Sequence, residues 1–357
     1  MSKTVRLVDV AEAAGVSRGT ASNVFNHPEL VRPEVRERVT KAAQRLGYGG
    51  PDPKGRLLRA GKVNAIGLVL SGTLAAGFRD PFDQLFMSGI GEVCDAYGAG
   101  LALLSAYGEF KEKTAWNIRS ALVDGFIVHC LEAQTSLLDI ARQRGLPFVA
   151  VDVEPEPGDM GIRIDDRGAA RAQARHLLSL GHRAIGILSL ELASGGRFGF
   201  VDRARYRSVR YAVTRDRLHG YADAFAEVGM DLFDVPIFET PIVEAVLSRD
   251  KAAEATAAIF ERVPETTAIL AMSDVAALGA LAYARANDIT VPEELSIIGF
   301  DGTPDGAEST PRLTTMAQPI VEKGRRAAEL VLAGGPPGVI TLGVKLIAGG
   351  TTARPRI

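Results

Sequence analysis

Polar side chains that could read DNA bases lie close together near the start of this 357-residue chain. An arginine can donate two parallel hydrogen bonds to a guanine, and an asparagine can pair in the same way with an adenine. Arg18 and Asn23 supply both groups within one short stretch, Leu7–Asn26. On a helix they would face solvent, where a DNA major groove could meet them. The candidate DNA-contacting residues of this stretch are Ser17, Arg18, Gly19, Thr20, Ser22 and Asn23.

The same stretch contains the signals for two short helices joined by a tight turn. Gly15 can adopt the positive φ that ends a helix, and Ser17 can cap the helix that follows. A third helix is expected from Pro33 to Leu46, with Gly47 as its C-terminal cap. The pattern predicts a helix-turn-helix, and the alternative is a helical hairpin within a bundle. Small apolar residues would form one side of the first helix: Val8, Val10, Ala11 and Ala14.

The charge of the chain is distributed unevenly. Residues 1–62 contain 12 Lys and Arg against 6 Asp and Glu, which gives this part a net charge of +6. The whole chain has a net charge of −2, so the remainder is acidic. This asymmetry is expected of a protein in which only one end meets phosphates.

The run LVDVAEAAGVSRGTASNVFN, followed by VRPEVRERVTKAAQRLGY, closely resembles the DNA-binding headpiece of the lactose-repressor/galactose-repressor family of transcription regulators. In that family the two residues after the cap serine and one residue a turn later read bases. The resemblance places these roles on Arg18, Gly19 and Asn23. Many members carry arginine at the position of Asn23 and a bulkier residue at that of Gly19. The operator sequence of a relative therefore cannot be transferred to this chain.

A segment rich in glycine and proline, residues 50–62, follows the expected headpiece. In the family that it resembles, this segment folds into a hinge helix on operator DNA, and a leucine wedges into the minor groove. Leu58 aligns with that leucine, and Lys54 and Arg56 are expected to contact phosphates. Lys54 and Gly55 replace better helix formers, so the hinge should be weakly helical on its own. A solvated linker is the alternative.

Short aliphatic runs alternate with helical stretches through the rest of the chain. This rhythm predicts parallel sheets covered by helices on both faces, and the number of runs predicts two α/β domains. The expected fold is an all-α helix-turn-helix headpiece plus a two-domain α/β core. The expected domains are residues 1–49, 50–62 and 63–357, the last divided into 63–163 with 320–334 and 164–318 with 335–357. The runs are Asn64–Leu70, Gly100–Ser105, Gly125–His129, Phe148–Asp152, Ile185–Ser189, Asp234–Phe238, Ala268–Met272 and Ser296–Phe300.

Phrases in this core, among them LGHRAIGIL and AILAMSDVAALGALAYARANDITVPEELSIIGFDG, resemble the effector-binding part of the same family, which is periplasmic-binding-protein-like. Ligands in such sheets lie at the carboxyl ends of strands. The chemistry fits a sugar, because carboxylates and an arginine bind hydroxyls and Phe82 can pack on the apolar face of the ring. For Arg217 and Asp301, an interdomain salt bridge or helix capping is the alternative. The effector contacts implied are Ser71, Asp80, Phe82, His129, Asp152, Arg217, Ser273, Asp274, Asp301 and Gln318.

Two features depart from the family. Arg163 stands where an aromatic or polar pocket residue is expected, and Glu191–Asp216 is longer than usual and rich in arginine. A solvated loop is one interpretation of this segment. The other is a lid that favours an anionic effector such as a sugar acid or sugar phosphate.

We therefore expect a sequence-specific transcription regulator, a repressor in most members of this family, that binds double-stranded operator DNA as a homodimer and responds to a small molecule. A nicotinamide-dependent dehydrogenase is disfavoured because SGTLAAG, and not a G-x-G-x-x-G motif, follows the first strand. An extracellular binding protein is disfavoured because the N-terminus lacks the apolar segment of a signal peptide. No cofactor or metal is expected, since Cys94 and Cys130 are too few for a metal site. No apolar run could span a membrane, so a cytoplasmic location is expected.

Overall fold

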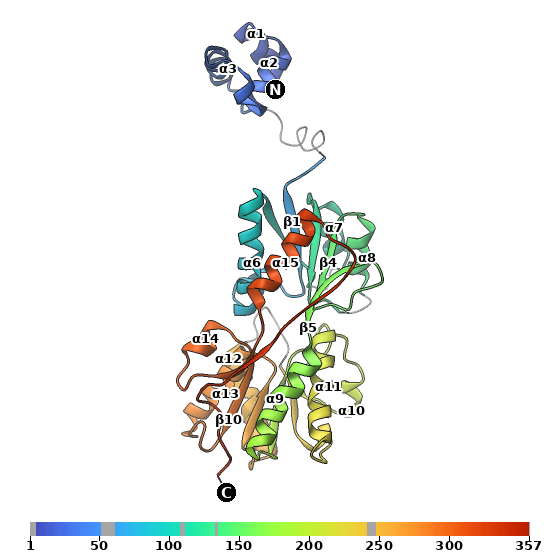
Figure 1. The fold of residues 1–357 in the computed structure, drawn as a ribbon, viewed down its shortest axis with the longest axis vertical. Coiled ribbons are helices and arrows are strands. Elements are labelled where there is room, and N and C mark those ends of the chain that lie inside the picture. Colours follow the sequence, from blue (N-terminus) through green and yellow to red (C-terminus); the bar gives the residue numbers. More distant parts are fainter. Residues whose placement is uncertain (1–4, 51–60, 108–110, 133–134, 241–247, 357) are drawn as a thin grey trace. The chain divides into compact units, whose positions relative to one another are not determined.

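The computed structural model describes residues 5–50, 61–107, 111–132, 135–240 and 248–356. It divides into two compact units, residues 1–63 and residues 64–357 (Figure 1). No helix among the described residues is long and apolar enough to cross a membrane.

The described residues of the first unit form three α-helices, α1 (Leu7–Ala14), α2 (Arg18–Asn26) and α3 (Pro33–Leu46), with a short 3-10 turn before α3. Gly15 and Gly47 end α1 and α3 with φ values of 64° and 68°, in the left-handed region that glycine tolerates. Small side chains let the helices pack closely around one core, which confirms the predicted helix-turn-helix. Its fully buried members are Val10, Ala11, Ala14, Ala21, Val24, Val31, Val39, Ala42 and Ala43.

The second unit begins with a six-stranded sheet in the order β12-β5-β4-β3-β1-β2, in which every pairing is parallel. Helices cover its inner strands β1, β3 and β4, which are buried as the sequence predicts for parallel sheets, whereas the edge strands β2 and β12 are half-buried or exposed. The strands are β1 (Ala65–Leu70), β2 (Gly100–Ser105), β3 (Gly125–His129), β4 (Phe148–Val151), β5 (Met160–Ile164) and β12 (Gly338–Leu342). The helices are α5 (Leu74–Gly77), α6 (Pro81–Tyr97), α7 (Lys111–Ser120), α8 (Ser136–Gln143) and α15 (Ile320–Ala333).

A second, seven-stranded sheet has the order β13-β11-β10-β9-β6-β8-β7, with a parallel centre and antiparallel strands at both edges. Its strands are β6 (Ile185–Ser189), β7 (Gly199–Phe200), β8 (Ile237–Glu239), β9 (Ala268–Ala271), β10 (Ser296–Asp301), β11 (Thr314–Ala317) and β13 (Lys345–Ile347). Its α-helices are α9 (Asp166–Leu180), α10 (Arg203–Tyr206), α11 (Ala212–Ala226), α12 (Arg249–Arg262), α13 (Asp274–Ala286) and α14 (Pro304–Glu308).

The chain crosses between the two sheets three times, after β5, β11 and β12 (Figure 1). The sequence analysis assigned residues 335–357 to the second subdomain, and this is wrong for β12, which pairs with β5 in the first sheet. The cause is a short edge strand whose aliphatic run, GVITL, is too brief to be assigned to one sheet by pattern.

Two glycines allow the backbones of α6 and α15 to pack in direct contact. A Cβ atom on Gly89 would lie 2.0 Å from the carbonyl oxygen of Val321, and one on Gly324 would lie 2.1 Å from that of Phe86. Only glycine permits this backbone contact. The first turns of α6 and α15 are therefore held in a fixed relation, and both carry residues of the site described below.

The arginine-rich segment Glu191–Asp216 is only in part a solvated loop. It contains β7, α10 and the first turn of α11, and β7 pairs with β8. The Arg205 guanidinium donates hydrogen bonds to the buried carboxylate of Glu239 and to the Phe200 carbonyl oxygen. Arg205 thereby pins the segment onto the second sheet.

Candidate functional site

The α2 helix presents Arg18, Gly19 and Asn23 to solvent, as the sequence analysis predicts. The Ser17 hydroxyl caps the helix, accepting from the Thr20 amide at 3.0 Å, and it lies 2.9 Å from the Thr20 hydroxyl. Ser22 is half-buried, and the Asn26 side chain donates to its carbonyl and hydroxyl oxygens. Arg18 and Asn23 are thus the free polar groups on this helix. The predicted hinge contacts Lys54, Arg56 and Leu58 lie outside the described residues.

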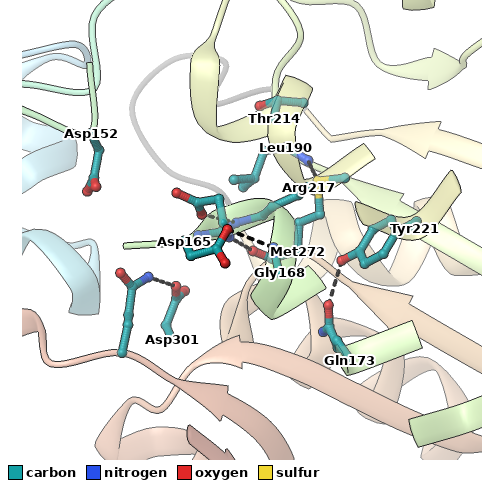
Figure 2. Close-up of polar contacts among 12 residues, drawn as sticks. Asp152, Asp165, Gly168, Gln173, Leu190, Thr214, Arg217, Tyr221, Met272 and Asp301 are labelled. Atoms are coloured by element: carbon teal, nitrogen blue, oxygen red, sulfur yellow. Dashed lines mark hydrogen bonds and ion pairs between the residues drawn. The ribbon is translucent and has the colours of Figure 1, made fainter. Parts of the chain in front are cut away.

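In the second unit, nine of the predicted effector residues line a single cavity of about 120 Å³. The side chains come from both sheets, at the carboxyl ends of strands or the first turns of the helices that follow. Figure 2 shows Asp152 on one side, with Arg217 and Asp301 opposite it. We call this cavity the cleft. Its predicted members are Ser71, Asp80, Phe82, His129, Asp152, Arg217, Ser273, Asp301 and Gln318.

Unusual backbone angles aim two of the carboxylates. Asp152 follows β4 with φ of 54°, and Asp301 ends β10 with φ of 115°. Cys130, which follows β3 and also lines the cleft, has φ of 51°. Residues other than glycine rarely adopt a positive φ. Those that do are concentrated at functional sites, where the surrounding structure holds the backbone in this conformation. The strain turns each carboxylate out of its strand.

Asp152 is the centre of a buried chain of polar contacts on the first-sheet wall. The Lys323 ammonium donates to Asp152 Oδ1 at 2.9 Å and to Oδ2 at 2.7 Å. His129 lies between two carboxylates, with Nε2 3.5 Å from Asp152 Oδ2 and Nδ1 3.5 Å from Asp83 Oδ1. Its ring stacks on Phe82 at a centroid distance of 5.3 Å. A neutral imidazole can donate from only one nitrogen, so this arrangement favours the imidazolium.

The pKa values of these groups follow from their partners. Burial alone would lower the pKa of His129, but hydrogen bonds to Asp152 and Asp83 raise it to about 9. Burial opposes the ionisation of Asp152, yet Lys323 and His129 hold the pKa of its carboxyl well below the usual range. Asp80 caps α6, and burial together with the charge of Asp83 raises its pKa to about 6. At neutral pH the wall therefore contains an ionised Asp152 carboxylate beside a charged His129 imidazolium.

The second-sheet wall is built around Arg217, whose side chain is 4% exposed. Its guanidinium donates to Asp166 Oδ1 at 2.8 Å and to the Met272 carbonyl oxygen, and it lies 3.6 Å from the centre of the Phe300 ring. Burial raises the pKa of the neighbouring Asp301 well above its ordinary value, despite Arg217. Gln318 joins the walls, since its amide donates to Asp301 at 2.8 Å and its oxygen accepts from Lys323 at 2.8 Å.

Two predicted effector residues are not in the cleft. The Asp274 carboxylate is fully buried and accepts hydrogen bonds from the Thr303 amide and the hydroxyls of Thr303 and Thr315. Its role is structural, because these partners occupy both oxygens. Arg163 lines a neighbouring cavity of about 380 Å³, together with Glu154, Arg215 and others.

Ser273 is both a cleft residue and the cap of α13, where it accepts from the Ala276 amide at 3.1 Å. Its hydroxyl oxygen accepts the amide proton, and its own proton is still able to bond to a ligand.

Sequence reasoning missed Asp83, which lines the cleft, and two charged residues behind its walls. Asp83 pairs with His129, and Lys323 and Asp166, which do not line the cleft, supply the counter-charges of Asp152 and Arg217. A lysine on the apolar face of an expected helix is a signal that could have revealed Lys323. Apolar and uncharged lining residues, which carry no such signal, are Cys130, Leu190, Val213, Met272, Val275 and Thr303. Among the described residues, no cluster of His, Cys, Asp and Glu could hold a metal ion.

Known proteins resemble the chain along nearly its whole length. The family model of bacterial regulatory proteins of the lacI family matches residues 6–50, and that of the periplasmic binding protein-like domain matches residues 174–352. HTH-type transcriptional regulator Rv3575c of Mycobacterium tuberculosis is 37% identical over 368 residues, which cover 99% of this chain and 100% of that protein.

Two solved structures have a similar fold. One is the lac repressor dimer bound to operator and the anti-inducer ONPF, with a TM-score of 0.75 and 25% identity over 98% of this chain and 100% of that one. The other is a complex of the transcriptional regulator CelR with cellobiose, with a TM-score of 0.68 and 25% identity over 97% of this chain and 99% of that one. The matching relatives are regulators, which excludes the dehydrogenase alternative. The chain therefore belongs to the lacI family of bacterial transcriptional regulators, and it is a DNA-binding regulator and not an enzyme.

Proposed function

We propose that the protein is a homodimeric repressor whose affinity for a near-palindromic operator changes when a sugar or a related polyol occupies the cleft. The observation that carries the proposal is the convergence of nine predicted residues from two sheets on one cavity. We assign residues 1–49 to the headpiece, 50–62 to the hinge and the rest to effector binding and dimerisation.

The arrangement of the cleft supports a ligand that changes the relation of the two sheets. Asp152 belongs to one wall, and Arg217 and Asp301 belong to the other (Figure 2). A ligand that contacts both walls favours whichever arrangement brings them to the right separation. Binding energy can then be transmitted through the crossing segments.

The chemistry of the walls supports a polyhydroxy ligand. Carboxylate oxygens accept hydrogen bonds from hydroxyls, Arg217 can donate to ring and hydroxyl oxygens, and Phe82 offers an aromatic face to C–H groups. The similarity to the CelR–cellobiose complex is consistent with a carbohydrate. The effector contacts that we propose are Ser71, Asp80, Phe82, His129, Asp152, Arg217, Ser273, Asp301 and Gln318.

The DNA side of the proposal is carried by α2, in which Arg18 and Asn23 are exposed and free to meet base edges. One headpiece buries only about 600–1,000 Å² on DNA, so two headpieces on paired half-sites are needed for tight binding at physiological salt.

Large apolar side chains exposed on α6, on α7 and in the segment after α7 support self-association. Trp116 is 67% exposed, Leu122 is 64% exposed and Tyr97 is 56% exposed. Apolar groups of this size are costly to leave in water. We propose a second copy of the chain as their partner, and the lac repressor resembling this chain is a dimer.

The decisive experiment measures operator binding by fluorescence anisotropy in the presence of a sugar panel. A sugar that changes the affinity of the wild type should have no effect on Asp301→Asn, whose sugar-free affinity should be unchanged. The control is Asp159→Asn, which removes a carboxylate paired with Arg142 away from the cleft. A full response in Asp301→Asn would show that this cleft is not the sensor.

A further inference from the structure

Lys323 occupies an unusual place for a charged side chain. It lies on the buried face of α15, shared with Ile320, Gly324, Ala327 and Val331, and its side chain is 1% exposed. An ammonium group in such a position loses its hydration and needs partners that replace it.

The partners of Lys323 use its whole hydrogen-bonding capacity. An ammonium group has three protons. They are directed to Asp152 Oδ1 at 2.9 Å, Asp152 Oδ2 at 2.7 Å and Gln318 Oε1 at 2.8 Å. Lys323 also lies 5.4 Å from the centre of the Phe82 ring. Because no donor is left for a ligand, Lys323 can act on recognition only through Asp152 and Gln318.

The two cations that line the described cleft are matched in the same way. The side chain of Arg217 pairs with Asp166 at 2.8 Å. His129 lies 3.5 Å from carboxylate oxygens of both Asp83 and Asp152. Each of the three cations therefore has a carboxylate partner within the protein, and Asp80 and Asp301 are further carboxyl groups of the cleft.

This balance decides which ligands can enter. A carboxylate or phosphate would meet no unmatched cation and would lie near the carboxylates of Asp152 and Asp80 in a site of low dielectric, where repulsion between like charges is strong. A hydroxyl donates to the free lone pairs of these oxygens and accepts from a neighbouring donor without adding charge.

We propose that Lys323 is a specificity-determining residue behind the cleft: by pairing with Asp152 it neutralises that carboxylate and leaves no cation for an anion, which reserves the site for an uncharged polyhydroxy ligand over the corresponding acid or phosphate. This inference rests on the proposed function, because it takes the cleft as the effector site. It also predicts that Asp152→Asn, which leaves Lys323 without a counter-charge, converts the site into one that prefers an anion.

The first test is calorimetry on the full chain with matched ligands: D-glucose against D-glucuronate and D-glucose 6-phosphate, and D-ribose against D-ribonate. For the wild type, a neutral member should bind about tenfold or more tightly than its anion. In Asp152→Asn the ratio should move toward the anion by about tenfold or more. Asp159→Asn removes a carboxylate that pairs with Arg142 outside the cleft, so it should leave the ratio of neutral to anionic affinity unchanged.

A double variant separates specificity from folding. Lys323→Met leaves the Asp152 carboxylate buried without its cation, so of these variants it should lose the most stability. Asp152→Asn with Lys323→Met removes both charges, so the fold should be retained. The anion preference gained in Asp152→Asn should then disappear, because the cation that causes it is gone. Retention of that preference in the double variant would contradict the role of Lys323.

A second test needs no ligand. In protein labelled with ¹⁵N at the lysine Nζ atoms, Lys323 should give a slowly exchanging ammonium signal, because three acceptors hold its protons. The signal should vanish in the Asp152→Asn, Lys323→Met variant and persist in Lys345→Met, which removes an exposed lysine.

The outcomes distinguish the inference from the proposed function. An anion that the wild type binds more tightly than its neutral partner, and that Arg217→Ala fails to bind, overturns the inference alone. A ligand that Arg217→Ala and Asp301→Asn both bind as tightly as the wild type does would overturn the proposed function. If the wild type binds none of these ligands, the ammonium signal still tests the inference. Rapid exchange of the Lys323 ammonium protons would contradict the pairing with Asp152 on which the inference depends.

Discussion

The recognition helix α2 and the cleft prepare their side chains in opposite ways. The side chains of Arg18 and Asn23 are exposed on α2 and make no hydrogen bond or ion pair to the described part of the chain. Arg217 and Asp152 in the cleft, and Lys323 behind it, are almost completely buried, and each is already paired. On α2 the partner supplies the interactions, whereas in the cleft a ligand must compete with interactions that exist.

This difference teaches where each kind of specificity comes from. Exposed groups lose little on binding, so base recognition on α2 depends on the match of donors and acceptors to the groove. Buried ion pairs have already lost their hydration, so the cleft discriminates through charge balance and can store a conformational response. Substitutions in the two regions should therefore differ in size and in the property that they change.

The largest effect is expected for Arg217→Ala. The change leaves Asp166 buried without its cation, which should lower the free energy of unfolding of the core unit by about 3–5 kcal/mol and abolish the response to effector. Urea denaturation and anisotropy measure the two properties. Arg167→Ala, which breaks the exposed pair with Asp223, should change little. Equal losses in the two variants would remove the contrast between buried and exposed pairs.

Arg18→Ala should cost operator affinity without cost to folding. The expected loss is about 1–3 kcal/mol on operator DNA, with relaxed preference at one base pair in each half-site, because a bidentate contact to a guanine is lost. Arg45→Ala, an exposed arginine near the end of α3, should weaken all DNA sequences alike or not at all. An equal loss for Arg18→Ala on operator and random DNA would show that Arg18 contacts only phosphate.

The parts of the fold that sequence predicts well are those set by local pattern. Gly15, Ser17 and Gly47 place the limits of the headpiece helices, and each of these signals acts within a few residues. Seven of the eight aliphatic runs coincide with strands of the sheets, and the eighth, Asp234–Phe238, overlaps β8 only at Ile237 and Phe238. Short strands at the edges or beside crossings, such as β7 and β12, were missed because their pairing depends on distant residues.

The sequence predicts those residues of the candidate site whose place follows from the fold and from their position in the chain. The resemblance placed Asp152, Arg217 and Asp301, and all three meet in the cleft. It could not show that Lys323, far along the chain, neutralises Asp152, because that pairing depends on how α15 packs. Asp274 was assigned to the ligand for the same reason: the threonines that bind its carboxylate come from other elements.

His129 gives the cleft a pH dependence that α2 lacks. Its pKa is raised from 6.5 to about 9 in the folded protein, so its stabilising contribution is complete below pH 6.5 and is lost as pH rises toward 9. Stability should fall by about 1–2 kcal/mol between pH 6.5 and 8 on this account. His129→Gln should flatten this slope in urea denaturation, and His219→Gln, a half-buried histidine outside the cleft, should retain it. An identical slope in both variants would place the titration elsewhere.

The smallest effect, at Ser17, can separate folding from recognition within α2. Ser17 and Ser273 cap their helices in the same way. Each hydroxyl oxygen accepts a hydrogen bond from the backbone amide three residues later, at 3.0 Å for Ser17 and 3.1 Å for Ser273. Ser17→Ala should lower the stability of the headpiece by about 1 kcal/mol, because the amide of Thr20 loses its acceptor. Ser17→Asp restores an acceptor at the same place and adds a negative charge to the surface that faces DNA. The aspartate variant should therefore be as stable as the wild type in thermal denaturation of the headpiece, yet bind operator more weakly than Ser17→Ala, with the deficit growing at low salt. If the aspartate variant bound operator as tightly as the wild type, this face of α2 would not lie against the phosphates, and the orientation of Arg18 and Asn23 toward the bases would have to be revised.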